Sequence, residues 1–191
     1  MGISKILNNK FLILSIVGTH AEENLSNIFN RKINEINNTS YTFWLIKSFR
    51  AKTEQIQQMA QSSLNTSQKI YCFFISPSQK NGAQPTKIVS LAQQFSNDNI
   101  NWLKIPKQIK VTGKIDNHTT GLVFDKISLT KNTQIDLWQY SNFFDQSKPI
   151  KMSQGASTVC AIKKYNQGMK SRYRQILAIG RLKHPYAVFL R

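Results

Sequence analysis

The sequence predicts a mixed α+β protein, α/β in its first half and β-rich in its second half. Two patterns support this fold class. Apolar runs of strand length alternate with helical apolar spacing over residues 1–97, and short apolar runs separated by polar turns fill residues 98–191. Because 191 residues suit one domain, we expect a single compact domain over 1–191, with these two parts packed together.

The first half is predicted to be β-α-β-α-β. The runs 11–18 (FLILSIVG), 41–49 (YTFWLIKSF) and 69–76 (KIYCFFIS) have the length and composition of strands, and they are apolar on both faces. Between them, apolar residues recur at helical spacing over 25–36 and 56–64. Strands that are apolar on both faces are typical of a parallel sheet covered by helices, which is the arrangement expected here.

The second half is predicted to be mostly strands. The polar segment 77–86, with one Gly and two Pro, predicts an exposed loop, and 87–96 predicts a short helix. Short strands are expected near 100–105, 108–113, 121–129, 134–140 and 157–165. The last two apolar runs, 174–180 and 185–190, are separated by RLKH and predict a hairpin.

The formal charge of +17 is unevenly placed along the chain. Residues 146–191 contain ten Lys or Arg and no Asp or Glu. Such unbalanced charge works against compactness and favours a polyanionic partner: nucleic acid, anionic lipid or an acidic protein. The alternative is a solvated charged face without a partner.

The N-terminal residues fit two interpretations. Lysines, an apolar stretch and small residues ending at Ala21 resemble a secretory signal, whereas 11–18 followed by a helical pattern is an ordinary first strand. We favour the strand, and with it a cytoplasmic or other intracellular location. Cys72 and Cys160 both lie in apolar runs and are expected to be buried thiols. No apolar stretch reaches the ~18 residues of a membrane span.

The C-terminal segment carries the main functional hypothesis. Strand alternation places Arg172 and Arg174 on one face and Tyr173 on the other, before the chain enters the core at Ile176. Arg grips phosphate with a planar fork, and Tyr offers a surface for base stacking. The candidate nucleic-acid contacts are Lys163, Lys164, Tyr165, Lys170, Arg172, Tyr173, Arg174, Arg181 and Lys183. The alternative is that these charges only protect a strand edge from aggregation.

A second candidate site follows the fold class. If the first three strands are parallel, polar residues after them meet at one edge of the sheet. The candidates there are His20 as a catalytic acid–base group, with Thr19, Ser48, Arg50, Ser76 and Lys80 as ligand contacts. The alternative is that these residues form ordinary polar loops. A pair of His20 and His118 acting as in a metal-free ribonuclease is a further possibility. The scattered acids predict no metal site, and no cofactor motif is present.

The sequence therefore predicts a protein that binds RNA or single-stranded DNA through its C-terminal basic surface, rather than an enzyme. One alternative is an enzyme acting on a phosphorylated or nucleic-acid substrate near His20. Another is a secreted, effector-like interaction protein.

Overall fold

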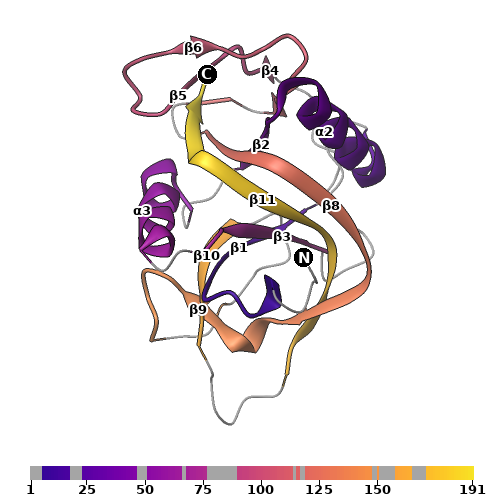
Figure 1. Cartoon of the computed structure of the whole chain (residues 1–191), viewed down its shortest axis with the longest axis vertical. Helices are drawn as coiled ribbons and strands as arrows, with labels where there is room; N and C mark the ends of the chain where they lie inside the picture. The colour runs from indigo at the N-terminus through magenta and orange to yellow at the C-terminus, as the bar shows by residue number, and fades with distance from the viewer. Residues whose placement is uncertain are drawn as a thin grey trace.

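We describe the fold from a computed structural model of the chain (Figure 1). The structure describes residues 6–17, 23–46, 51–65, 68–76, 90–113, 115–116, 119–147, 150, 158–164 and 171–191. Two helices and a large curled mixed sheet of nine strands make up most of this part of the chain, and a separate pair of short strands accompanies them. The predicted fold class, mixed α+β, is confirmed.

The predicted order of the first five elements is also confirmed. These are β1 (Phe11–Ile16), α2 (Leu25–Thr39), β2 (Thr42–Ile46), α3 (Thr53–Leu64) and β3 (Tyr71–Ile75). Helix α2 begins at Asn24, whose side chain accepts a hydrogen bond from the Asn27 backbone N–H at 2.8 Å. It ends at Ser40, which adopts the left-handed conformation.

The strand order differs from a simple parallel sheet. The order is β2-β8-β11-β3-β1-β10-β9, and β5 and β6 attach beside β11. Strands β1 and β3 are parallel neighbours, as the fold class predicts. Strand β2 instead lies at the far edge and pairs antiparallel with β8. The parallel-sheet rule, on which the second candidate site depends, therefore does not apply to β2.

The second half consists of strands. They are β4 (Ser90–Leu91), β5 (Gln94–Ser96), β6 (Leu103–Lys104), β7 (Thr112–Gly113), β8 (Thr120–Asp136), β9 (Tyr140–Asn142), β10 (Thr158–Lys163) and β11 (Tyr173–Leu190), with the 3₁₀ turn η1 (Leu137–Gln139) before β9. The short helix predicted at 87–96 is wrong, because β4 pairs with β7 and β5 pairs with β6 and β11. The loop predicted at 77–86 lies outside the described residues.

The predicted C-terminal hairpin is also wrong. Residues 173–190 form one continuous strand, β11, whose two parts both pair with the equally long β8. Leu182 pairs with Phe124 and Ala187 pairs with Leu122, so four residues of β11 bulge opposite Val123. Pro185 lies inside this bulge, where its missing N–H leaves no gap in the hydrogen-bond ladder. Figure 1 shows β8 and β11 as the two long bent strands that cross the molecule.

The sheet has a buried core on each face. On one face, α2 and α3 contribute Phe29, Ile56 and Met59 to a core that includes Phe74 and Phe124. On the other face, strands β1, β3, β8, β10 and β11 enclose a second core. A third, smaller core near β2 and the end of β11 completes that second face.

One glycine is required by close packing within the helix-covered core. A Cβ placed on Gly180 would lie 2.5 Å from Cε1 of Phe124. That is far inside van der Waals contact, so only glycine lets β11 run this close to the Phe124 ring.

Candidate nucleic-acid interface

Three lysines from distant parts of the sequence meet at one end of the sheet. The backbone N–H of Lys163 donates to the carbonyl of Lys10 at 2.8 Å, so these two residues sit side by side on β10 and just before β1. Lys69 precedes β3, and the parallel pairing of Leu12 with Tyr71 places Lys69 beside Lys10. The Asn9 side-chain amide donates to the Lys69 carbonyl at 2.8 Å and ties the two segments together.

Lys183 extends this row onto the next strand. Arg181 pairs with Tyr71, and the backbone N–H of Leu182 donates to the Ile70 carbonyl at 3.0 Å. Continuing this antiparallel register by one residue brings the backbone of Lys183 to the level of Lys69, where the bulge of β11 begins. The backbones of Lys10, Lys69, Lys163 and Lys183 thus lie at one level of four neighbouring strands, and we call these residues the lysine rim. The Lys183 ammonium extends toward β2 and lies 5.9 Å from the ring centroid of Tyr41.

The lysine rim is positively charged and accessible. Lys10, Lys69 and Lys183 are exposed, and Lys163 is half-buried. The Lys163 ammonium donates to the Leu7 carbonyl and to Oδ1 of Asn8, both at 3.1 Å and both uncharged. Within the described ranges, none of the four lysines forms an ion pair with a carboxylate.

Such a row is electrostatically unfavourable in the free protein. Neighbouring strands are about 4.8 Å apart, so the four backbones span about 14 Å. Two unit charges about 5 Å apart repel by about 0.8 kcal/mol in water, although flexible lysine side chains spread to relieve part of this. Like charges on directly opposed residues destabilise a sheet. A polyanion lying along the row would remove this repulsion.

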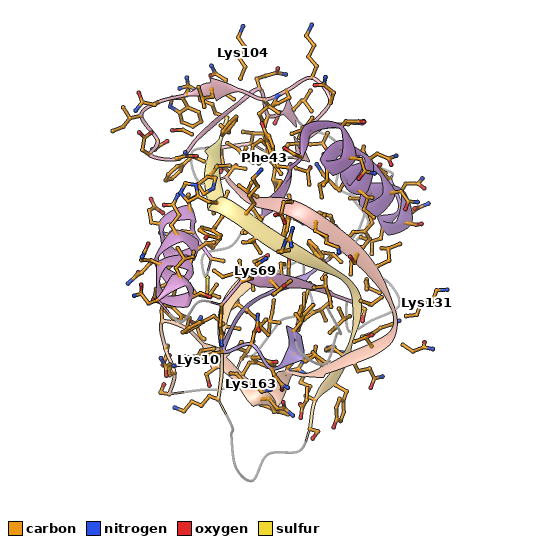
Figure 2. The ribbon with its side chains drawn as sticks, viewed as in Figure 1. Lys10, Phe43, Lys69, Lys104, Lys131 and Lys163 are labelled. Atoms are coloured by element: carbon orange, nitrogen blue, oxygen red, sulfur yellow. The ribbon has the colours of Figure 1, made fainter. Side chains whose placement is uncertain are left out.

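Lysines elsewhere do not join the rim. Figure 2 shows Lys10 and Lys163 close together, with Lys69 above them, while Lys104 and Lys131 extend outward at other edges of the molecule. Lys104 and Lys131 are also exposed. They are therefore natural controls for the rim.

Arg181 differs from its basic neighbours because it is already paired. Its Nε and NH2 groups donate to the two carboxylate oxygens of Asp125 at 2.7 and 3.0 Å. This hydrogen-bonded pair raises the pKa of Arg181 above its usual value. Arg181 was a predicted phosphate contact, and in the free protein Asp125 neutralises its charge.

Arg172, Tyr173 and Arg174 form a second basic group at the start of β11. Tyr173 is 60% exposed, and the two arginines on either side of it are half-buried, in agreement with the predicted alternation. Burial, followed by the nearby Arg172, lowers the pKa of Arg174. The Nε of Arg174 is buried without a hydrogen-bond partner in the described part of the chain. Neither guanidinium pairs with a described carboxylate.

The predicted C-terminal surface therefore separates into two groups. Nine residues of extended strand, about 30 Å along its axis, separate Arg174 from Lys183. Lys163 and Lys183 lie in the rim, and Lys164 follows it, with its ammonium donating to the Gln146 carbonyl at 2.8 Å. Tyr165 and Lys170 lie outside the described residues.

Most of the predicted strand-end crevice falls outside the described residues: Thr19, His20, Ser48, Arg50 and Lys80, together with His118. Ser76 is described, and its backbone N–H donates to the Gln175 carbonyl at 3.0 Å at the end of β3.

Other chemistry-bearing groups in the described ranges have structural environments. These residues include no cluster of three His, Cys, Asp or Glu able to hold a metal ion, and no helix among them is long and apolar enough to cross a membrane. Cys72 and Cys160 are buried and unpaired, as predicted. Burial raises the pKa of the Cys160 thiol to about 12.

A buried ion network joins α2 to the segment before β7. Glu35, 3% exposed, accepts from the Lys32 ammonium at 2.8 Å, from Arg31 at 3.1 Å and from the Lys110 backbone N–H at 3.1 Å. The Thr42 hydroxyl donates a short hydrogen bond to the same carboxylate. Burial lowers the pKa of Lys32 to about 8. Because every charge here has a partner, we assign this network to the stability of the fold.

Sequence reasoning identified Lys163 and Lys183 but missed Lys10 and Lys69. The signal was present, because Lys10 and Lys69 directly precede the apolar runs of two predicted strands. Only the register of four strands shows that these positions meet. No protein-family model, no curated protein and no solved structure matches this chain.

Proposed function

We propose that this protein binds single-stranded nucleic acid, RNA or DNA, with the lysine rim as its main phosphate contact. The observation that carries the proposal is the placement of four lysines at one level of four neighbouring strands, with no described carboxylate among their partners. Lysine ammoniums act as point charges toward phosphates, so this contact reads the backbone and not the base sequence.

The Arg172–Arg174 group supports the same function. Two guanidiniums that pair with no described carboxylate offer forked contacts to phosphate, and the exposed ring of Tyr173 offers a stacking surface on the opposite face of the strand. A flexible single strand can contact two basic groups that are about 30 Å apart along β11, because sites for single strands commonly cover ~4–16 nucleotides.

The test is the salt dependence of binding to a fluorescent single-stranded oligonucleotide. The four lysines of the rim contribute about −3 to the slope of log affinity against log salt, since each phosphate contact contributes about −0.7, and contacts by Arg172 and Arg174 add to this value. The double variant Lys10→Gln/Lys69→Gln should reduce the magnitude of the slope by about 1.5 and lower affinity at low salt. The matched control is Lys104→Gln/Lys131→Gln, which removes the same charge away from the rim.

Two results would overturn the proposal. One is an absence of binding to any single-stranded oligonucleotide at low salt. The other is an equal loss of slope in the rim variant and in the control variant, which would mean that binding depends on net charge and not on the rim. A third result would also refute nucleic-acid binding: the protein binds anionic lipid vesicles in preference to oligonucleotides, and only the rim variant loses vesicle binding. The rim would then be a membrane-binding surface.

A further inference from the structure

A pocket of about 300 Å³ lies beside the last residues of β11. Its walls are formed by Asn99, Trp102, Asp116, Thr119, Phe189, Leu190 and Arg191. Two aromatic side chains, an amide, a carboxylate, a hydroxyl and a guanidinium thus surround one small volume, and the Thr119 hydroxyl donates to the Asp116 carboxylate at 3.2 Å. This volume is at the lower end of the ~300–1,000 Å³ that ligand sites usually occupy.

The cation in this pocket is held in place. The guanidinium carbon of Arg191 lies 4.0 Å from the ring centroid of Trp102, a stacking contact. Its Nε donates to Oε1 of Gln94 at 2.8 Å, and the Arg191 backbone N–H donates to the Gln94 carbonyl at 3.1 Å. No carboxylate in the described part of the chain pairs with this guanidinium, so its terminal N–H groups are open to an anion.

The adjoining turn is also fixed. The carboxylate of Asp98 accepts hydrogen bonds from the backbone N–H groups of Ile100 and Asn101 at 2.9 and 2.8 Å. These bonds hold the pKa of Asp98 well below its usual range. Asn99, on the pocket wall, therefore sits in a turn whose shape is set before any ligand arrives.

We infer that this pocket binds one unpaired nucleotide. A base packs against the aromatic walls provided by Trp102 and Phe189, its N–H edge faces the amide of Asn99 and the carboxylate of Asp116, and its phosphate meets Arg191. Aromatic rings with a fixed guanidinium are the combination by which proteins hold unpaired bases. The inference rests on the proposed function for the choice of ligand, but it uses a separate set of residues.

The chemistry argues against simpler ligands. Inorganic phosphate would use Arg191 and leave the aromatic walls in water, whereas a purely apolar ligand would leave Arg191 and Asn99 unpaired. A nucleotide satisfies both kinds of wall. The nucleotide can be free or can belong to a strand, and the experiment separates these two sources.

The experiment is calorimetric titration of the full chain with AMP, UMP, the matching nucleosides and inorganic phosphate. We expect saturable binding of at least one nucleotide, weaker binding of its nucleoside, and no binding of phosphate alone at the same concentration. Trp102→Leu should weaken nucleotide binding about five- to 150-fold, the range for losing one stacked base. Phe144→Leu, which removes an exposed aromatic ring with no role in either proposed site, is the control and should change nothing.

Arg191→Gln tests the phosphate contact without removing the stacking surface. Arg191 is exposed, so its replacement should leave the hydrophobic core intact. The variant therefore tests nucleotide binding even if Trp102→Leu fails to fold. The preference for nucleotide over nucleoside should disappear. An unchanged preference in a folded Arg191→Gln variant, or no saturable nucleotide binding by the natural chain at millimolar concentration, would overturn the inference.

The outcomes separate this inference from the proposed function. If oligonucleotides bind through the rim but mononucleotides do not bind, only the pocket inference fails. If mononucleotides bind at Trp102 while oligonucleotide binding ignores the rim, only the proposed function fails. An oligonucleotide in which one nucleotide is replaced by an abasic site tests whether the pocket takes a base from a strand. If it does, this oligonucleotide should bind more weakly than the intact one. Equal binding would mean that the pocket binds free nucleotides.

Discussion

The substitution Glu35→Gln should destabilise the protein by about 3 kcal/mol at pH 7, within the range of 3–5 kcal/mol for breaking a buried ion pair. Gln keeps the size of Glu, so the change removes charge and not volume. The Lys32 ammonium, which is 4% exposed, then loses its charged partner and is neutral in the folded variant.

The magnitude has two parts. Because the pKa of Lys32 is about 8 in the natural chain, removing its proton at pH 7 costs about 1–2 kcal/mol. The remainder comes from the hydrogen bonds that Arg31, Thr42 and the Lys110 backbone donate to the carboxylate, each of which contributes about 0.5–1.5 kcal/mol. In a chain of this size the loss corresponds to a fall in Tm of about 6–12 °C.

The assay is urea unfolding followed by circular dichroism at pH 7 and pH 10. Lys32 has a folded pKa of about 8, below its unfolded value of 10.5, so its contribution to stability rises as pH rises from 8 toward 10.5. At pH 10 Lys32 is neutral in both folded proteins, and the difference between variant and natural chain should shrink by about 1–2 kcal/mol.

A matched control is Glu54→Gln, on the exposed first turn of α3, which should change stability by at most about 1 kcal/mol. The reasoning is refuted if Glu35→Gln costs no more than this control. It is also refuted if the cost of Glu35→Gln is the same at pH 7 and pH 10.

Three further predictions concern the sheet. Gly180→Ala should destabilise the protein by about 1–3 kcal/mol in the same urea assay, because the new Cβ overlaps the Phe124 ring; a neutral effect would show that the ring moves aside. Asp125→Asn should raise affinity for single-stranded nucleic acid and steepen the salt slope by about 0.7, because it frees Arg181 to contact phosphate; lower affinity would exclude Arg181 from the interface. Both cysteines should resist a thiol reagent in the folded protein and react after denaturation, because their thiols are buried; rapid labelling of the folded chain would place a cysteine at the surface.

Local patterns predicted the first half of the fold well. The continuous apolar runs at β1, β2 and β3 and the helical spacing at α2 and α3 each specify one element without reference to distant residues. The predictions failed where pairing partners decide the structure. The apolar residues of 87–96 fit a helix, yet Leu91 is 45% exposed and Ala92 is buried in a strand-rich layer.

The same limit applies to the interface. The sequence predicts the interface at 163–191 because basic residues are dense there. Most of this run belongs to one long strand, β11, so its charges lie at separate places along that strand. Lys10 and Lys69 do not belong to a dense basic run in the sequence. Only the registers β1–β10, β1–β3 and β3–β11 show that they lie at the same level of the sheet as Lys163 and Lys183. The polyanionic partner that charge composition predicts stays a prediction, and strand register locates the proposed contact.

The position of β11 in the strand order sets the order of assembly. This strand lies between β8, which carries β2, and β3, which leads to β1, β10 and β9, and all of these strands precede β11 along the chain. Until β11 emerges from the ribosome, no described strand pairs with both β8 and β3, so each half-sheet exposes an open edge and the two are joined by side-chain packing such as that of Trp44 and Phe124 on Phe74. Folding must therefore wait for the most distant partner, which makes it slow and leaves the nascent chain dependent on protection from aggregation.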